Sequence, residues 1–389
     1  MCVEPIALKR VFAYPATILM ITVGFCRCPE KGRCKRVFLN VVFNDSIMKT
    51  ETSDRKMEHI RICLEKPVEF EKSNGFERYA FSHNALPELD WDEIDTSTEF
   101  LGKNFSAPIF IEAMTGGTDE ARAINQNLAK AAEELGLGMG VGSQRAAIED
   151  EQKIHTYDVR NVAPNILLLA NIGAAQIAEY GPDNIRKVVD MIKADGLAVH
   201  LNTAQELFQA KGHRDWRNVI RDIKSLSLLG FPVIAKEVGC GISADTAKRL
   251  EEAGVSAIDV AGAGGTSWVK VESYNHGSGI AKEFCEWGIP TAESLRQCRE
   301  AVATPLISSG GIRTGVEMAK SIAMGASLAG MALPLLKPAT ESHEAVKLKL
   351  EQVITELKST MLLVGARNIE ELRRTPVVDI TFSSNTPKV

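Results

Sequence analysis

The chain has 389 residues, of which 45% are hydrophobic and 24% are charged. That length is ample for one large core with added segments, such as a barrel of roughly 250 residues with extensions, and it fits two domains equally well. The formal net charge of −5 excludes a global basic field of the kind that binds nucleic acid or an anionic membrane, so local groups must hold any bound anion.

Residues 1–47 differ in character from the rest of the chain. The stretch Val11–Phe25 is apolar and follows two basic residues, which superficially resembles a signal sequence, but Pro15 interrupts it and no small-x-small cleavage site follows. It is also short for a membrane span. We therefore expect residues 1–47 to be a dispensable extension, with Met48 as an alternative start, and we expect no membrane association.

The 8 cysteines show no spacing typical of a zinc site. Four of them crowd the first tenth of the chain, the other four are scattered, and no C-x-x-C occurs. This usage predicts a protein of the reducing cytoplasm whose thiols are structural.

Residues 48–106 form a polar segment ahead of the first apolar strand. Arg55, Lys56 and His59 lie in a short helical pattern that Pro67 ends. From spacing alone, this pattern is typical of a solvated charged face.

From residue 107 onward, apolar runs of strand length alternate with segments of helical period. This alternation predicts a parallel sheet with a helix after each strand. Eight such units in one unbroken series favour a closed (β/α)8 barrel, which we place at residues 107–366, with a C-terminal tail at 367–389. The predicted strands are Pro108–Thr115, Leu137–Ser143, Ile166–Asn171, Leu197–Leu201, Val233–Lys236, Ala257–Ala261, Leu306–Ser308 and Ser327–Met331.

Helices are predicted between these strands and after the last one. Thr118 and Ser243 offer N-cap side chains to two of them. The helix over Thr314–Met324 is expected to bury one face, formed by Val316, Ala319, Ile322 and Ala323. The predicted helices are Asp119–Leu135, Asn184–Lys193, Trp216–Leu229, Ser243–Ala253, Ala292–Val302, Thr314–Met324 and His343–Leu363.

Polar residues gather where the predicted strands end, which is where a (β/α)8 barrel carries its function. Lys236 follows apolar residues, and a buried lysine needs a charged or acceptor partner. Glu237 or Glu206 would serve as a structural partner, but the other polar strand ends favour a bound anionic ligand. Those residues are Thr115, Ser143, Gln144, Arg145, Asn171, His200, Gln205, Glu206 and Thr266.

Two small-residue turns follow the seventh and eighth predicted strands. Gly310-Gly311 lets the backbone approach a ligand and exposes N–H groups, and Ala329-Gly330 leaves the next strand end equally uncrowded. Either pair alone is typical of an ordinary turn. Together, in this order and with Arg313 nearby, they predict a phosphate site.

A set of motifs in this order resembles the type 2 isopentenyl-diphosphate isomerase family, from about Thr52 to about Val364. Several of the motifs are specific individually. They are RKMEH at 55–59, AMTGG at 113–117, GSQR at 142–145, NIG at 171–173, HLN at 200–202 with QE at 205–206, VIAKEVG at 233–239, AGAGGTSW at 261–268, WGIPTAESL at 287–295 and SGGIR at 309–313.

The resemblance implies a TIM barrel that binds flavin mononucleotide (FMN) and interconverts isopentenyl and dimethylallyl diphosphate in isoprenoid precursor biosynthesis. It also implies a requirement for Mg²⁺, NAD(P)H as a reductant of the flavin, and a homo-oligomer, either a tetramer or an octamer. The flavin contacts that it implies are Ala113, Met114, Thr115, Ser143, Asn171, Lys236, Thr266, Gly311, Ile312, Arg313, Ala329 and Gly330.

The same resemblance implies a set of substrate contacts and one metal ligand. Arginine and lysine suit a diphosphate, and Mg²⁺ takes few protein carboxylates when phosphate oxygens complete its shell. Glu206 is the implied Mg²⁺ ligand. The implied substrate contacts are Arg55, Lys56, His59, Ser143, Gln144, Arg145, His200 and Gln205.

The reaction protonates an unactivated alkene, and no ordinary side chain is acidic enough for that. We therefore hypothesise that reduced flavin is the acid–base catalyst and that Gln205 positions the alkene or relays a proton. Lys236 would stabilise the anionic reduced flavin.

Two alternatives use the same barrel. An FMN-dependent α-hydroxy-acid oxidase or dehydrogenase would need a histidine base after the sixth strand, where this chain has Gly262–Thr266. A flavin-binding protein without catalysis would not need Arg145, Gln205 or Glu206.

Overall fold

The chain divides into two compact units, residues 1–54 and residues 55–389, in a computed structural model that describes residues 8–14, 17–25, 37–42, 45–276 and 279–381. In the first unit, β1 (Leu8–Tyr14), β2 (Thr17–Phe25) and β3 (Val37–Val42) form an antiparallel sheet with β2 in the middle. The described residues of the apolar stretch Val11–Phe25 therefore lie on two strands. None of the described helices is both long enough and apolar enough to span a bilayer.

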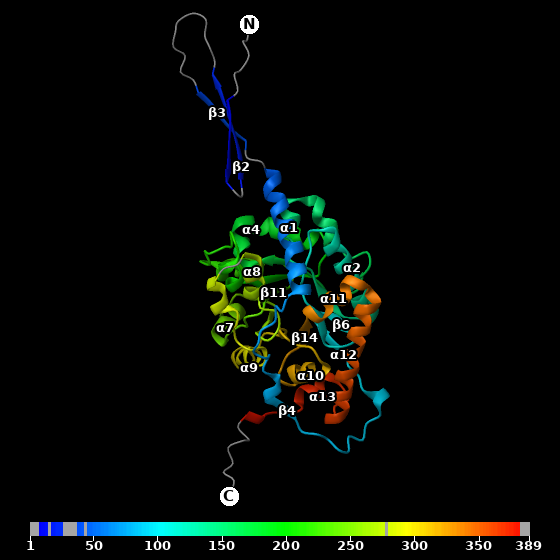
Figure 1. Cartoon of the computed structure of the whole chain (residues 1–389). Helices are drawn as coiled ribbons and strands as arrows, with labels where there is room; N and C mark the ends of the chain where they lie inside the picture. Colours follow the sequence, from blue (N-terminus) through cyan, green and yellow to red (C-terminus); the bar gives the residue numbers. More distant parts are fainter. Residues whose placement is uncertain (1–7, 15–16, 26–36, 43–44, 277–278, 382–389) are drawn as a thin grey trace, which may run out of the picture. The chain divides into compact units, whose positions relative to one another are not determined.

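In the second unit, all eight predicted strands are present and close into one parallel barrel (Figure 1). Neighbours in the barrel follow the chain order from β7 to β14, and β14 pairs with β7. The fold prediction of a TIM barrel is confirmed. The strands are β7 (Ile109–Ile111), β8 (Gly138–Gly140), β9 (Leu168–Gly173), β10 (Gly196–Leu201), β11 (Val233–Glu237), β12 (Ala257–Asp259), β13 (Leu306–Ser308) and β14 (Leu328–Met331).

Side chains alternate between the two faces of the barrel wall because successive residues of a strand point to opposite sides. In β11, Val233 and Ala235 pack in the cluster shared with the surrounding helices, whereas Ile234 packs in a second cluster inside the barrel. Every other strand except glycine-rich β8 also sends an apolar side chain into this inner cluster. Its members are Phe110, Leu167, Leu169, Ala198, Ile234, Ala257, Ile307 and Leu328, with Phe100, Phe105 and the partly buried Leu101 from outside the barrel.

The helices form the outer layer, and α12 packs against α2, α10 and α11. Thr118, Ser243 and Ser342 cap three of them by accepting a backbone N–H bond on their side-chain oxygens. The helices are α1 (Asp45–Glu65), α2 (Asp119–Leu135), α3 (Arg145–Glu149), α4 (Ile177–Asp190), α5 (Thr203–Phe208), α6 (Val219–Leu226), α7 (Ala244–Glu252), α8 (Trp268–His276), α9 (Thr291–Ala301), α10 (Gly315–Ala323), α11 (Leu333–Glu341), α12 (His343–Val364) and α13 (Ile369–Arg374).

Segments on either side of the barrel pack onto it in short strand pairs. The strand β15 (Val377–Asp379), within the predicted tail, pairs with β4 (Tyr79–Phe81) from before the barrel. The hairpin of β5 (Thr98–Phe100) and β6 (Lys103–Phe105) supplies Phe100 and Phe105 to the inner cluster. The 3-10 turns are η1 (Phe76–Arg78), η2 (Trp91–Glu93), η3 (Glu151–Thr156), η4 (Ala174–Gln176) and η5 (Gly279–Phe284).

Two helices differ from their predictions for local reasons. The predicted buried face of α10 included Val316, but its side chain is 43% exposed, and the helix instead buries Met318 together with Ala319 and Ile322. The fourth helix begins before the predicted Asn184, and the left-handed Gly181 interrupts it just ahead of Pro182. The N–H groups in the first turn of a helix have no partner within the helix, so the N–H that proline lacks is not missed there. The second part of α4 therefore begins at Pro182.

The crossing of α10 and α12 depends on a glycine. A methyl group at Gly315 would lie 2.2 Å from the Leu357 nitrogen and 2.4 Å from the Val353 oxygen, both backbone atoms of α12. We expect Gly315→Ala to lower the free energy of unfolding by about 2–3 kcal/mol, because rigid backbones must separate. Urea unfolding measures this. Gly140→Ala, whose methyl group would meet only ordinary contacts, is the matched control, and equal stability of the two variants would contradict the prediction.

Candidate active site

The polar mouth of the barrel continues the alternation that builds its apolar interior. Two residues after each strand's contribution to the inner cluster, the next inward position carries a polar side chain or a glycine. A polar layer therefore lies on top of the apolar one. This layer collects residues from seven strands at their C-terminal ends. They are Glu112, Asn171, His200, Lys236, Asp259, Ser309 and Gly330.

Lys236 is the buried cation of this layer. Its ammonium lies 3.3 Å from the Asp259 carboxylate and 3.5 Å from that of Glu112, and it donates a 2.7 Å hydrogen bond to the Glu237 carbonyl oxygen. Burial alone would lower the pKa of Lys236, but the charges of Asp259 and Glu112 outweigh burial and raise it. Lysine therefore stays charged at the centre of the barrel mouth.

The partners of Lys236 differ from those that the sequence suggested. The Glu237 side chain instead accepts N–H bonds from the three residues that follow it, and Glu206 binds elsewhere. Glu112 and Asp259 were missed because each follows apolar residues in a predicted strand. An acidic residue at an inward-facing position near the end of a predicted strand could have identified each of them as a partner of Lys236.

The predicted phosphate site is a backbone cradle between the ends of β12, β13 and β14. Gly310 and Gly311 have φ values of 101° and 76°, and within the described residues the N–H groups of Gly310, Gly311 and Ile312 make no hydrogen bond. Successive free N–H groups in a glycine turn form an anion-binding concavity. Gly265 lies so close that a methyl group there would be 2.5 Å from the Gly311 nitrogen.

The segment Val68–Glu71 runs along this cradle. Phe70 donates its N–H to the Gly265 carbonyl oxygen at 2.9 Å, and Ser267 donates its N–H to the Val68 carbonyl oxygen at 2.8 Å. The Glu69 carboxylate pairs with the guanidinium of Arg313. Because this segment follows α1, it connects the helix that carries Arg55 to the cradle.

Asn74 holds the glycine turn itself. Its side-chain N–H groups donate to the Gly311 carbonyl oxygen at 2.8 Å and to the Glu317 carboxylate at 2.7 Å. Glu317 completes a capping box with Thr314 at the start of α10. The turn is thus fixed before any ligand arrives.

Cations gather beside the polar layer. The Lys56 ammonium donates to the Ser143 carbonyl oxygen at 2.8 Å and to the Tyr157 hydroxyl at 2.5 Å, and Arg145 pairs with Glu149 at 2.7 Å. Burial and the charge of Arg55 lower the pKa of Lys56 to about 7. The pKa of a lysine falls this far only where like charges and lost water are not yet offset by an anion.

Arg55 is the least neutralised member of this group. Its guanidinium makes no hydrogen bond or ion pair with the described residues, and burial together with the charge of Arg145 lowers its pKa. The more distant carboxylates of Glu272 and Glu206 act in the opposite direction. The site therefore has unused positive charge.

A network of hydrogen bonds and one close histidine–carboxylate contact joins α1, α5 and α8. The Gln205 side-chain nitrogen donates to the Glu272 carboxylate at 3.1 Å, and the same oxygen lies 3.2 Å from His59 Nε2. Asn202 donates through its side-chain nitrogen to both Gln205 and Glu206, at 3.2 Å each. Burial alone would raise the pKa of Glu272, but His59, Gln205 and Arg55 hold it below its usual range.

Glu206 lies beside an unpaired oxygen. One of its carboxylate oxygens accepts the bond from Asn202, and the other accepts the His213 N–H at 2.6 Å. The buried Asn202 Oδ1 has no hydrogen-bond partner among the described residues. In that part of the chain, no group of three or more histidine, cysteine or acidic side chains forms a metal site, so a cation here would depend on oxygens of another molecule.

Gln144 and His200 occupy structural positions near the mouth. The fully buried Gln144 amide donates to the Val188 carbonyl oxygen and accepts the Asn171 N–H, so both its ends contact backbone. His200 Nδ1 lies 2.7 Å from the Asn171 side-chain oxygen. Burial and the charge of Lys236 lower the pKa of His200 to about 3, so its ring is neutral at pH 7.

The predicted residues thus divide into three groups. Lys236, Asn171 and the turns with Thr266, Ile312 and Ala329 surround the cradle and the polar layer, and Ala113, Met114 and Thr115 follow β7 at the same end. Arg55, Lys56, Ser143 and Arg145 form the cationic group. His59, Gln205 and Glu206 form the third group, in the network with Asn202 and Glu272. Glu272 and Tyr157 were missed, because the first lies in a helix of mixed character and the second in a loop. No sequence signal pointed to Tyr157, whose ring packs so close to Gly116 in the structure that a methyl group there would strike it.

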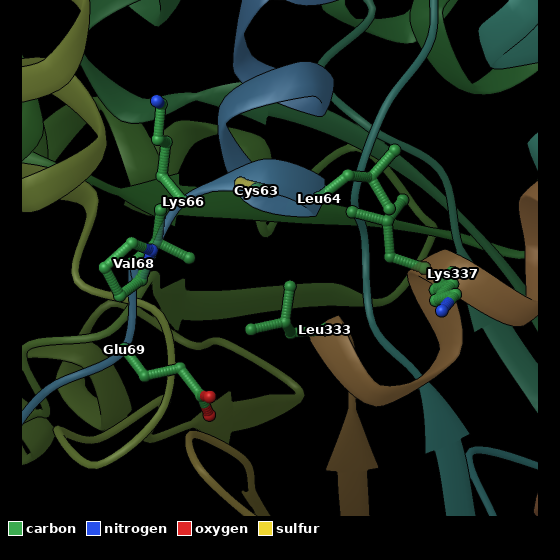
Figure 2. A pocket seen from close by; sticks show the side chains of 9 residues that line it. Cys63, Leu64, Lys66, Val68, Glu69, Leu333 and Lys337 are labelled. Atoms are coloured by element: carbon green, nitrogen blue, oxygen red, sulfur yellow. The ribbon is translucent and has the colours of Figure 1, made fainter.

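A small pocket of about 180 Å³ lies outside the polar layer (Figure 2). It is formed by the end of α1, the segment after it and the first turns of α11, and Glu69 connects it to the Arg313 pair. Its Cys63 thiol has a pKa that burial raises to about 12, which makes it unreactive. This pocket contains none of the polar residues of the barrel mouth. It is lined by Cys63, Leu64, Lys66, Pro67, Val68, Glu69, Leu333, Leu336 and Lys337.

Solved structures similar to this chain share its fold. A flavocytochrome b2 variant with pyruvate bound aligns with a TM-score of 0.62 and 17% identity, covering 85% of each chain. A mandelate oxidase variant with a monooxide FMN adduct aligns with a TM-score of 0.57 and 17% identity, covering 79% of this chain and 90% of that one.

Sequence relatives are much nearer. The family model described as FMN-dependent dehydrogenase matches residues 66–161 and 182–379. Proteins named isopentenyl-diphosphate delta-isomerase are 48% identical over 343 residues in Thermococcus onnurineus, covering 85% of this chain and 92% of that protein, and 49% identical over 341 residues in Methanosarcina barkeri, covering 85% and 93%. One from a Nostoc species is 47% identical over 331 residues, covering 83% and 95%. With this identity over nearly the whole length of those relatives, and with the FMN-dependent family model, the chain belongs to the FMN-dependent, type 2 isopentenyl-diphosphate delta-isomerase family.

Proposed function

We propose that this chain interconverts isopentenyl diphosphate and dimethylallyl diphosphate. The observation that carries the proposal is the excess positive charge beside the barrel mouth, where Arg55 and Lys56 lie next to the Arg145–Glu149 pair without a carboxylate partner of their own among the described residues. A diphosphate supplies the missing negative charge, and the forked donors of arginine suit its oxygens. Such a ligand would place a short hydrocarbon chain next to Gln205 and Glu272.

The residues at the barrel mouth fit FMN. The free N–H groups of Gly310, Gly311 and Ile312 fit its phosphate, and Lys236 offers a positive charge to the ring. Ala113, Met114, Thr115, Ser143, Asn171 and Thr266 complete the proposed contacts, with Arg313, Ala329 and Gly330 at the phosphate end. When bound in its reduced form, FMN supplies a group that gives a proton to the alkene and takes one back.

The protein would contribute by orienting the hydrocarbon chain of the substrate through Gln205. Gln205 is held from both ends, by Asn202 at its amide oxygen and by Glu272 at its amide nitrogen, so its direction is fixed. Glutamine is a poor base, and Glu272 is the ionised group one hydrogen bond away from it. We assign Gln205 to the positioning of the alkene, with Glu272 and His59 as the groups that set its orientation.

We assign Glu206 to Mg²⁺. Its carboxylate and the unpaired Asn202 Oδ1 offer oxygen donors, which are the ligands that Mg²⁺ prefers, and diphosphate oxygens and water would complete the shell. His200 and Gln144 are proposed to support the site through Asn171 rather than through direct charge, because His200 is neutral and both amide ends of Gln144 contact backbone.

Three further properties are proposed. NAD(P)H is the proposed reductant of the flavin, by resemblance to the family. A homo-oligomer is supported by exposed apolar side chains at Leu207 and Trp287, which are 49% and 61% exposed. A cytoplasmic location is supported by the free thiols of the described cysteines Cys63, Cys240, Cys285 and Cys298.

The alternative of α-hydroxy-acid oxidation is less favoured. The loop Gly262–Thr266 after β12 carries no histidine or arginine, and Gly262 and Gly264 pack directly against the backbone of Thr291 and Asn74. No base is available there to abstract a proton from a hydroxy acid.

An oxygen-free assay tests the proposed function. Protein loaded with FMN, reduced by a nicotinamide and supplied with Mg²⁺ should convert isopentenyl diphosphate to dimethylallyl diphosphate, followed by NMR, without stoichiometric consumption of the reductant. Removal of Mg²⁺ with a chelator should abolish turnover, and its return should restore it. Oxidation of lactate or mandelate in place of isomerisation would select the alternative.

Substitution of Gln205 tests its positioning role. We expect Gln205→Ala to lower kcat by about a hundredfold, because the alkene loses its orientation, while the affinity for FMN stays unchanged. Flavin fluorescence titration and the isomerase assay measure the two quantities. Gln297→Ala, on α9 and bonded to Glu293, is the matched control. Full turnover of Gln205→Ala with FMN bound would remove Gln205 from the mechanism.

The lowered pKa of Lys56 predicts a pH dependence of substrate binding. With a pKa of about 7 in the free site, Lys56 loses its charge as the pH rises, and binding of a diphosphate must then take up a proton. We expect the Kd of the FMN-loaded protein for isopentenyl diphosphate to rise up to about tenfold per pH unit between pH 7.5 and 9.

Lys56→Arg should flatten this profile, because arginine remains charged throughout the range. Lys320→Arg, at a half-buried lysine on α10 whose ammonium donates to the Phe76 carbonyl oxygen, should leave the profile unchanged. Calorimetry in buffers of different ionisation enthalpy also counts the protons. A flat profile for the unsubstituted protein would show that Lys56 does not pair with the diphosphate.

A further inference from the structure

Glu112 is a buried carboxylate without a hydrogen-bond donor of its own. Its side chain follows β7, it is 4% exposed, and neither of its oxygens accepts a hydrogen bond from the described residues. Buried carboxylates are almost always satisfied, because the loss of water is costly. A buried carboxylate without donors is expected where a bound ligand supplies the missing hydrogen bonds.

The neighbours of Glu112 are committed to other groups. The Lys236 ammonium lies 3.5 Å from it but is closer to Asp259 and donates to the Glu237 carbonyl oxygen. Ser309 donates its hydroxyl to Asp259 at 2.7 Å. Burial and the nearby negative charge of Asp259 raise the pKa of Glu112, which shows how poorly the protein alone accommodates it.

Glu112 lies between the two ends of the cofactor site. A methyl group at Gly330, next to the phosphate cradle, would be 2.2 Å from Glu112 Oε1, so the carboxylate directly covers that glycine. On its other side is Lys236, the cation assigned to the flavin ring. The part of FMN that joins its phosphate to its ring is the ribityl chain, which carries three hydroxyl groups.

We propose that Glu112 is a cofactor-binding residue whose carboxyl group accepts hydrogen bonds from the ribityl hydroxyl groups of FMN. The proposal rests on the FMN site of the proposed function and adds a contact that neither the sequence motifs nor the phosphate cradle supply. The chemistry is that of a polyol on a carboxyl group, which gives short, charge-assisted bonds when the acceptor is ionised.

Two variants test the proposal. Glu112→Met keeps the length of the side chain and removes both acceptors, and Glu112→Gln retains one. In FMN titrations followed by flavin fluorescence, Glu112→Met should raise the Kd by roughly tenfold to a hundredfold, and Glu112→Gln should raise it less. The cofactor-free Glu112→Met protein should unfold at a higher temperature than the unsubstituted one, because an unsatisfied buried group has been removed.

A second titration identifies the cofactor atoms. FMN analogues that lack one ribityl hydroxyl, at the 2′, 3′ or 4′ position, should bind the unsubstituted protein more weakly. For at least one analogue, Glu112→Met should cause no further loss, because the partner of the missing hydroxyl is gone in both cases. Equal FMN affinity of Glu112→Met and the unsubstituted protein, or the same loss by Glu112→Met with FMN and all three analogues, would overturn the proposal. Failure of the unsubstituted protein to bind any FMN would instead overturn the proposed function and this contact with it.

Discussion

The arrangement of the site depends on one buried charge, the ammonium of Lys236 among the carboxylates of Asp259 and Glu112. A cation at this depth is tolerable only with close negative partners, and the two partners come from two other strands of the barrel wall. Removing the cation itself would be costly, because two buried carboxylates would be left without a positive partner. The interaction therefore fixes the relative positions of the ends of β7, β11 and β12, on which a flat cofactor can rest.

The two halves of the mouth have opposite electrostatic deficits. On the side of β7 and β12 there are more carboxylates than cations, and the protein leaves acceptors unused. On the side of α1 and α3 there are three cations, Arg55, Lys56 and Arg145. Only one carboxylate among the described residues, that of Glu149, pairs directly with any of them. Two ligands would balance these sides: one that donates hydrogen bonds to the unused carboxylate oxygens, and one whose phosphate charge neutralises the excess cations. An oxidase for a singly charged hydroxy acid has no need of so much uncompensated charge.

The strand order and closure of the barrel could be predicted from the sequence because they follow from a repeated alternation of apolar runs and helical periods. The glycine turn at Gly310-Gly311 could be predicted as well, since only backbone chemistry was needed. Side-chain partnerships could not. Asp259 lies beside Lys236 because β11 and β12 pair in that register, and Glu112 reaches the same ammonium from more than a hundred positions away because the barrel closes. No local sequence pattern contains either contact.

Individual misplacements have the same origin. Val316 satisfied the period of its helix but lies on the side that no neighbour covers, and the helix is oriented by the close approach of Gly315 to α12. Gln144 belongs to a motif at the barrel mouth, yet its amide points back toward the Val188 carbonyl oxygen. Glu237 looked like the natural partner of its neighbour, but adjacent residues in a strand face opposite sides, so its side chain could not reach inward.

The segment Val68–Glu71 links the helix that carries Arg55 and Lys56 to the loop beside the phosphate cradle. It is bonded along its length to the loop at Gly265–Ser267, and it is the continuation of the helix that presents Arg55 and Lys56. Under the proposed function, one continuous segment of chain would therefore contact both the FMN phosphate site and the diphosphate. If FMN makes the loop at Gly265–Ser267 more rigid, this segment would become more rigid with it. By linkage, loss of the flavin would then lower the affinity for the isoprenoid diphosphate.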